Sequence, residues 1–127
     1  MLRKNTLALL FRIALAIVVV VILHLATTAR SYPVAEDLND KVSHILAFAT
    51  LSFLSDFSFP ARRFVPLTCA CLLGYGLLIE IIQYFIPYRS ASALDWIADA
   101  LGIGLYLASV PLLKRVPVLR ERWRQGR

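Results

Sequence analysis

Apolar and polar residues follow one another along this chain in long blocks rather than at the short periods of amphipathic elements. Four stretches are strongly apolar, and shorter polar segments separate them: residues 7–29, 42–59, 64–85 and 93–113. A helix needs about 20 apolar residues to cross the hydrocarbon core of a bilayer. The pattern therefore predicts an all-α fold, an integral membrane bundle of four transmembrane helices. Residues 1–113 form its single domain and residues 114–127 a basic cytoplasmic tail.

The overall composition also favours lipid as the solvent. Hydrophobic residues make up 59% of the 127 positions, whereas soluble domains contain roughly 45–50%. A soluble protein of this size has too little interior to bury so much apolar surface. The chain has no glycine-rich phosphate loop and no zinc-knuckle spacing, so we predict the lipid bilayer as a partner and no nucleic acid.

The first apolar stretch admits two interpretations. Arg3 and Lys4 precede it and Thr27 to Ala29 follow it, which is also the layout of a signal peptide with a weak cleavage site. We favour a retained helix, because the apolar run continues to Ala26 and nothing downstream resembles a secreted domain. Arg12, near the start of the stretch, is close enough to the membrane surface to extend its guanidinium into the headgroups.

The positions of the basic residues predict the orientation. They precede the first stretch, lie between the second and third as Arg62 and Arg63, and number six in the tail. Because cytoplasmic loops are enriched in Lys and Arg, we expect both termini on the cytoplasmic side of the membrane. The acidic segment of residues 30–41 and the turn that carries Arg89 then lie outside the cell.

This orientation gathers the polar residues of the apolar stretches at one side of the membrane. Glu80 and Gln83 are three apart, and Asp95 and Asp99 are four apart, so each pair shares a helical face. We predict a polar pocket that opens to the outside and is lined by the second, third and fourth helices. Its candidate residues are Asp40, Lys41, His44, Glu80, Gln83, Arg89, Asp95 and Asp99.

A purely structural interpretation competes with the pocket. The cationic residues would then neutralise the acids in a buried clamp, and four glycines would allow close helix approach: Gly74, Gly76, Gly102 and Gly104. Hydrophobic residues would hold such helices together at lower cost, so we favour a functional pocket. Asp56, near the other end of the second stretch, is interpreted as an interface acid paired with Arg62 or Arg63, without a functional role.

The chemistry of the pocket stays open. Neighbouring carboxylates share protons, so one of them can act as an acid or a base. His44 with Glu80 and Asp99 could hold a divalent cation, but no spacing here specifies a metal. We therefore predict no metal and no cofactor. No pairing of serine with histidine is evident for nucleophilic catalysis.

Several separated motifs, in order, resemble those of the VanZ-like family of small bacterial membrane proteins, named for a teicoplanin resistance protein. The entrance motif Asp-Lys-x-x-His with a following aromatic is present as Asp40, Lys41, His44 and Phe48. The later motifs Glu-x-x-Gln, Pro-x-Arg and Asp-x-x-x-Asn-x-x-Gly correspond to Glu80, Gln83, Pro87, Arg89, Asp95, Asp99 and Gly102. The resemblance covers residues 40–104. The usual Asn is Asp99 here, which adds a carboxylate and indicates altered proton or cation handling.

The resemblance implies a multi-pass protein of the bacterial plasma (inner) membrane. It also implies a role in the cell envelope and lowered susceptibility to teicoplanin, without a settled reaction. One hypothesis is a resistance or binding factor for a lipid-linked or glycopeptide-like ligand. A second is a membrane enzyme that acts on a lipid or cell-wall precursor by acid–base chemistry. A third is a structural membrane subunit. Because four helices enclose little space, a partner chain in an oligomer is a candidate for completing the pocket.

Overall fold

The computed structural model describes residues 2–27, 36–59, 67–86, 93–117 and 119–120, and the side chains of all of these except residues 2–5 and 36–40. They form four helices: α1 (Leu2–Thr27), α2 (Glu36–Ser58), α3 (Cys69–Tyr84) and α4 (Ala93–Leu113). No strand occurs in these ranges. Each predicted apolar stretch contains one helix, so the all-α prediction is confirmed.

The helix boundaries differ from the apolar boundaries where polar residues extend a helix. α2 begins at Glu36, six residues before the predicted start at residue 42. Acidic residues near a helix N-terminus are stabilised by the helix dipole, so Glu36, Asp37 and Asp40 favour this extension although they are not apolar. α3 is shorter than predicted, because its α-helical part begins at Cys69.

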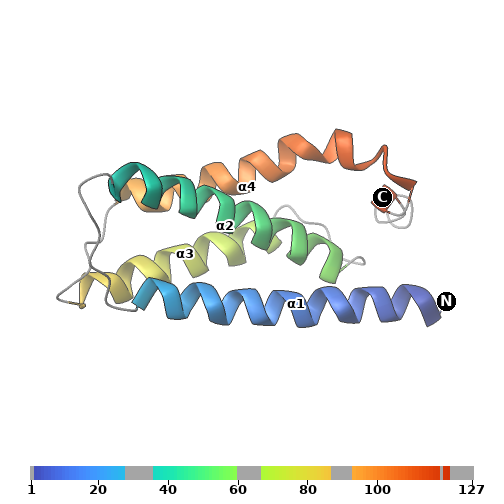
Figure 1. The fold of residues 1–127 in the computed structure, drawn as a ribbon, viewed down its shortest axis with the longest axis horizontal. Coiled ribbons are helices and arrows are strands. Elements are labelled where there is room, and N and C mark those ends of the chain that lie inside the picture. Colours follow the sequence, from blue (N-terminus) through green and yellow to red (C-terminus); the bar gives the residue numbers. More distant parts are fainter. Residues whose placement is uncertain (1, 28–35, 60–66, 87–92, 118, 121–127) are drawn as a thin grey trace.

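The four helices run along the long axis of the molecule in alternating directions (Figure 1). The start of α1 and the end of α4 therefore lie at one end of the bundle. The end of α3 and the starts of α2 and α4 lie at the opposite end, which we call the site end. This arrangement brings polar residues that are far apart in the sequence to the same end of the bundle.

Helix α2 is the centre of the bundle. It packs most extensively against α4 and next against α1. Its Phe48 and Leu51 form the core with Leu72 of α3 and with Ile103 and Tyr106 of α4. Because three helices cover α2, its polar residues face protein: Ser52, Ser55, Asp56 and Ser58 are all buried.

Two of the described helices are long and apolar enough to cross a membrane. Residues Thr6–Thr27 of α1 have a mean hydropathy of 2.9, and Ala93–Leu113 has 1.6. Only 6% of the α1 window is buried within the bundle, so most of this helix presents apolar side chains to its surroundings. α3 is apolar but shorter. A membrane protein is thus plausible, and four spans with cytoplasmic termini remain a prediction.

Glycine permits close helix approach at two of the four expected positions. A Cβ on Gly102 would overlap the carbonyl oxygen of Ile45 and lie 3.0 Å from Cβ of Phe48, so α2 and α4 meet there almost backbone to backbone. Gly76 lies similarly close to Asp99. The prediction is wrong for Gly74 and Gly104, because a Cβ on either would meet no atom of the described residues within 4 Å.

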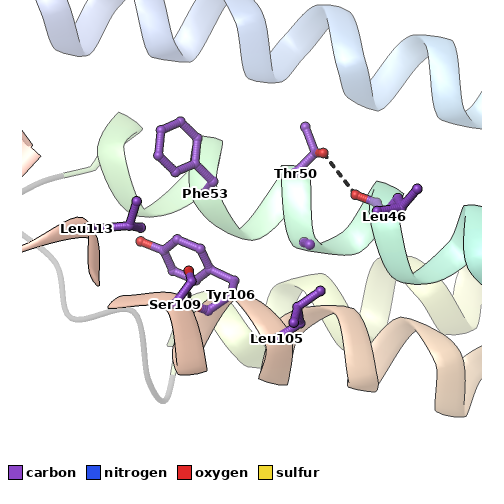
Figure 2. A pocket seen from close by; sticks show the side chains of 8 residues that line it. Leu46, Thr50, Phe53, Leu105, Tyr106, Ser109 and Leu113 are labelled. Carbon is purple, nitrogen blue, oxygen red and sulfur yellow. Dashed lines mark hydrogen bonds between the residues drawn. The ribbon is translucent and has the colours of Figure 1, made fainter. Parts of the chain in front are cut away.

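An apolar groove of about 350 Å³ lies between α2 and α4 (Figure 2). Its lining is almost wholly apolar and consists of Leu46, Ala49, Thr50, Phe53, Leu105, Tyr106, Ser109 and Leu113. The Thr50 hydroxyl donates a hydrogen bond to the carbonyl of Leu46, one turn earlier. Such back-bonding satisfies the hydroxyl within its own helix, so the groove offers little polar chemistry.

Candidate functional site

The candidate site is a polar cluster at the site end of the bundle, built by three helices. α2 contributes Lys41 and His44, and α3 contributes Glu80 and Gln83. α4 contributes Asp95 and Asp99, so residues separated by more than 50 positions meet here. Two predicted members are not placed: the side chain of Asp40 and the whole of Arg89 lie outside the described residues.

Helices α2 and α4 face each other through two polar side-chain pairs. The Lys41 ammonium donates to Oδ1 of Asp95. One turn further along both helices, Nδ1 of His44 lies 2.6 Å from Oδ1 of Asp99. Lys41 and His44 are three residues apart on α2, so their side chains lie on one face of that helix, towards α4. Asp95 and Asp99 are four residues apart on α4, so theirs lie on the face towards α2. The parallel direction of α2 and α4 then aligns the two pairs.

The acids of this cluster are more deeply buried than its cations. Asp99 is 0% exposed, Asp95 2% and Glu80 7%. The side chain of His44 is 13% exposed and that of Lys41 29%. The described part of the cluster therefore has its negative charge inside and its lysine at the rim. A ligand entering beside Lys41 would meet a cation first and carboxylates deeper in.

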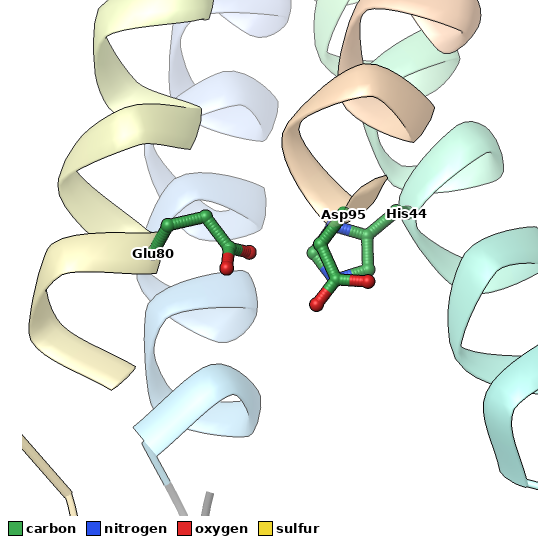
Figure 3. Close-up of side chains that lie close together, drawn as sticks. All are labelled: His44, Glu80 and Asp95. Carbon is green, nitrogen blue, oxygen red and sulfur yellow. The ribbon is translucent and has the colours of Figure 1, made fainter. Parts of the chain in front are cut away.

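Glu80 joins the cluster from the third helix. It points from α3 towards Asp95 and His44 (Figure 3). Each of these three residues offers one ligand atom, and the three atoms lie within 4.8 Å of one another. Two carboxylates and an imidazole at this separation can share a proton or hold a cation. The prediction that the second, third and fourth helices line one polar region therefore agrees with these positions.

Gln83 ties the cluster to the end of α1. Its Nε2 donates a hydrogen bond of 3.0 Å to the carbonyl of Ala26. Gln83 is 4% exposed, and its Oε1 accepts no hydrogen bond from any residue that the structure describes. A buried amide oxygen without a donor is costly, so this position suits an additional donor from a ligand or a water molecule.

Gly76 makes room for the deepest acid. A Cβ at this position would lie 2.6 Å from Oδ2 of Asp99 and 3.2 Å from Cζ of Phe48. Gly76 is four residues before Glu80 and therefore on the same face of α3. The absence of a side chain at Gly76 lets α3 approach the Asp99 carboxylate, which is why this acid is fully buried.

Comparison with known proteins identifies the family. Residues 7–114 match the sequence profile of the VanZ/LLP1 family. The chain belongs to the VanZ/LLP1 family. An uncharacterized protein of Schizosaccharomyces pombe is 36% identical over 98 residues, which is 75% of this chain and 59% of that relative. The chain thus spans about three-fifths of the length of the relative. No solved structure matches this chain.

The family match confirms the resemblance derived from the separated motifs. The VanZ/LLP1 profile extends over α1 as well as over the motif region of residues 40–104. Helix α1 is therefore part of the family domain, although it adds no charged residue to the described cluster. The Ala26 carbonyl that receives the Gln83 hydrogen bond is its contribution.

One buried acid of this VanZ/LLP1 protein lies outside the cluster and was not recognised as an interior residue from sequence. Asp56 of α2 is 3% exposed, and the Tyr106 hydroxyl of α4 donates a hydrogen bond of 2.5 Å to its Oδ2. The arginines predicted to pair with it, Arg62 and Arg63, lie outside the described residues. Ser52, four residues earlier and fully buried, shares the face of Asp56. That spacing is the signal that could have shown an inward orientation.

Proposed function

We propose that this VanZ/LLP1 protein is a multi-pass protein of the bacterial plasma membrane, with both termini in the cytoplasm. We propose further that its polar cluster faces the outside of the cell and binds a component of the cell envelope. One observation carries this proposal: three helices bring buried Glu80, Asp95 and Asp99 together with Lys41 and His44 at one end of an apolar bundle. Charged groups are expensive in a membrane, and where they occur they usually serve a function.

Four spans are supported by how α2 is packed. Its 23 residues extend about 34 Å at 1.5 Å per residue, enough for a hydrocarbon core of about 30 Å. Its low hydropathy is no obstacle, because its serines and Asp56 face other helices instead of lipid. The basic residues at the start of α1 and after α4 belong to the end opposite the cluster, which favours a cytoplasmic position for that end.

The charge of the cluster indicates the kind of group it binds. Among its described side chains, three carboxylates face one lysine and one histidine. Carboxylates accept hydrogen bonds and attract cations, so these three favour a partner that supplies positive charge or hydrogen-bond donors. A glycopeptide such as teicoplanin, or a lipid-linked precursor with donor groups, is the class of ligand that we propose.

Survival on teicoplanin tests this proposal. A sensitive host expresses the wild-type protein, Glu80→Gln or Asp99→Asn, and the amount of each protein in the membrane is measured. We expect protection by the wild type and its loss in Glu80→Gln, which keeps the shape of the side chain and removes its charge. Asp99→Asn restores the amide typical of the resembling family and is expected to increase protection.

The matched control is Asp56→Asn, which removes a buried carboxylate from the same central helix but outside the cluster. It should protect as well as the wild type at equal expression. Absence of protection by well-expressed wild type and by Asp99→Asn would contradict a teicoplanin role. Equal loss in Glu80→Gln and Asp56→Asn would instead indicate that any buried charge is needed for assembly, as expected of a structural subunit.

The His44–Asp99 pair supports an alternative function as a membrane enzyme. A carboxylate that fixes an imidazole by a 2.6 Å contact is the usual arrangement for a histidine general base. Such an enzyme would act on a lipid or cell-wall precursor. It predicts that His44→Gln abolishes turnover of labelled membrane lipids or precursors while expression is unchanged. Identical product patterns with wild type and His44→Gln would exclude His44 as the base.

A further inference from the structure

We propose that His44, Glu80 and Asp95 bind one divalent cation of the Mn²⁺ or Zn²⁺ class. In this arrangement Asp99 is a positioning residue that holds the imidazole of His44. The inference deepens the function proposed above, because it names a cation for the same cluster and rests on that cluster being a binding site. A bound cation would present its remaining coordination positions to an oxygen of the envelope ligand.

The first argument is the convergence of ligands from three helices. The ligand atoms of His44, Glu80 and Asp95 lie within 4.8 Å of one another. Three ligands at about 2.1 Å from one ion are about 3.0–3.4 Å apart, because at most two of them can lie on opposite sides of it. A shift of up to about 1 Å per side chain would therefore complete the site. Glu80 already points across from α3 to the other two residues (Figure 3).

The second argument is the way in which His44 is held. Its Nδ1 lies 2.6 Å from Oδ1 of Asp99, a residue that is 0% exposed. Histidines that bind metals almost always donate their other ring N–H to a carboxylate, a carbonyl or water, which sets the ring orientation. The Asp99 contact assigns Nε2 of His44 as the ligand atom. Gly76 maintains this contact, because a side chain there would displace the Asp99 carboxylate.

The contact of Lys41 with Asp95 allows a test that depends on charge. Lys41 lies at the rim of the cluster, and its ammonium contacts Asp95, one of the three proposed ligands. Lys41 would then compete with the cation for Asp95. Removing the positive charge of Lys41 should therefore strengthen cation binding.

Gln83 supplies an independent indication that the cluster takes a further group. Its Oε1 is buried and accepts no hydrogen bond from any described residue. Gln83 lies three residues after Glu80 on the same face of α3. Water molecules bound to a cation are strong hydrogen-bond donors, and one of them would satisfy this oxygen. The three protein ligands leave coordination positions for such waters.

The donor set indicates the kind of cation. Imidazole suits Zn²⁺ and other transition ions, whereas carboxylates suit Mn²⁺ and harder ions. One imidazole with two carboxylates therefore favours Mn²⁺ or Zn²⁺. Mg²⁺ and Ca²⁺ prefer sites made of oxygen ligands alone.

The experiment is a titration of the purified full-length protein in detergent, freed of metals with a chelator. Free Mn²⁺ is measured by its electron paramagnetic resonance signal, and Zn²⁺ is added afterwards to displace bound Mn²⁺. The expected result is one Mn²⁺ bound per chain and released by Zn²⁺. A wild-type protein that binds neither ion above the level of empty micelles overturns the inference.

Four variants test the inference, because they are expected to change Mn²⁺ binding in different directions or by different amounts. Glu80→Gln and His44→Asn should each weaken binding at least tenfold. In His44→Asn the amide nitrogen takes the place of Nδ1 and keeps the Asp99 contact, so the loss reports on Nε2. Asp99→Asn keeps a side-chain oxygen that can accept from Nδ1 of His44, so it should still orient the imidazole and bind Mn²⁺ within about tenfold of the wild type. Lys41→Gln should tighten binding by about threefold to tenfold, because it removes one nearby positive charge.

Asp56→Asn is the matched control, since it removes a buried acid outside the cluster. It should bind Mn²⁺ as the wild type does, and gel filtration and helical circular dichroism should show the same folded protein for every variant. Weaker binding in Lys41→Gln, or equal loss in Asp56→Asn and Glu80→Gln, overturns the inference. Protection against teicoplanin by a protein that binds no metal would overturn the cation site and leave the envelope function standing.

Discussion

Helices α2 and α4 bury acids at two places, and the two places differ in the contacts that the acids make among the described residues. Near the end of α2, Asp56 accepts a hydrogen bond from the neutral Tyr106 hydroxyl of α4. At the site end, Asp95 and Asp99 of α4 face Lys41 and His44, and Glu80 enters from α3. His44 and Asp56 are twelve positions apart on one helix, about 18 Å at 1.5 Å per residue.

This comparison separates a structural acid from a candidate functional one. Asp56 has a neutral donor on the neighbouring helix and connects α2 to α4, as expected of a residue that stabilises the bundle. The site end brings three buried carboxylates together with Lys41 and His44, and it recruits a third helix to do so. Gathering buried charges costs stability, so this end is the better evidence of function.

The largest loss of stability is expected from a substitution that separates α2 from α4 and so disrupts both places at once. Gly102→Ala puts a Cβ against the backbone of Ile45 and Ala49, and overpacking of this kind costs about 1–3 kcal/mol or more. We expect a loss of about 3 kcal/mol in the free energy of unfolding, measured by denaturation in mixed micelles. Both the Asp56–Tyr106 hydrogen bond and the cluster should be weakened.

Gly104→Ala is the control for that change, because a Cβ there meets nothing within 4 Å. Alanine is the better helix former by about 1 kcal/mol, so this variant should be as stable as the wild type or more so. Equal destabilisation by both changes would contradict the close contact of α2 with α4 at Gly102.

The second-largest loss of stability is expected from a substitution that affects only Asp56, the structural acid. Tyr106→Phe removes the hydroxyl that donates to Asp56, and depriving a buried acceptor of a donor costs about 1–3 kcal/mol. We expect a lower free energy of unfolding together with unchanged Mn²⁺ binding and unchanged teicoplanin survival at equal expression. A large loss of either property in a folded Tyr106→Phe protein would show that the two places act together.

The smallest change in the free energy of unfolding, and one of opposite sign, is expected from Glu80→Gln. The substitution keeps the size of the side chain and removes one of three neighbouring carboxylates. Relief of like-charge repulsion should leave the protein as stable as the wild type or raise the free energy of unfolding by about 1 kcal/mol. The cluster should meanwhile lose its binding.

The same unfolding measurement checks this prediction with Asp56→Asn beside it. A fall of more than about 1 kcal/mol in Glu80→Gln would make the cluster a clamp between helices. The distinction between a structural acid and a functional cluster would then disappear, and the structural-subunit hypothesis would be the better one.

Much of the candidate site was predictable because helical spacing alone determines a shared face. The pairs Glu80/Gln83 and Asp95/Asp99 follow from that spacing, and alternating helix directions place them beside Lys41 and His44. The partners within the cluster were not predictable. Spacing does not say that Lys41 contacts Asp95 while His44 contacts Asp99, because this depends on the register of α2 against α4.

The glycines illustrate the same limit. All four lie in apolar helices and looked equivalent in sequence, yet only Gly76 and Gly102 face a neighbouring helix at close range. A nearly uniform apolar helix has no polar stripe that would show which side turns inward. Packing against the neighbouring helices decides the orientation. The burial of Asp56 was missed for that reason, and so was the hydrogen bond that it accepts from Tyr106.

By itself the sequence determined that the chain is all-α, that its apolar residues form four blocks, and that it carries the motifs of the VanZ/LLP1 family. These properties depend on local composition and spacing. Only the tertiary structure decided which acid contacts which cation, which glycines touch a neighbour, and that Asp56 has a neutral partner. Those features depend on the rotation and register of one helix against another, which arise from the summed packing of all four.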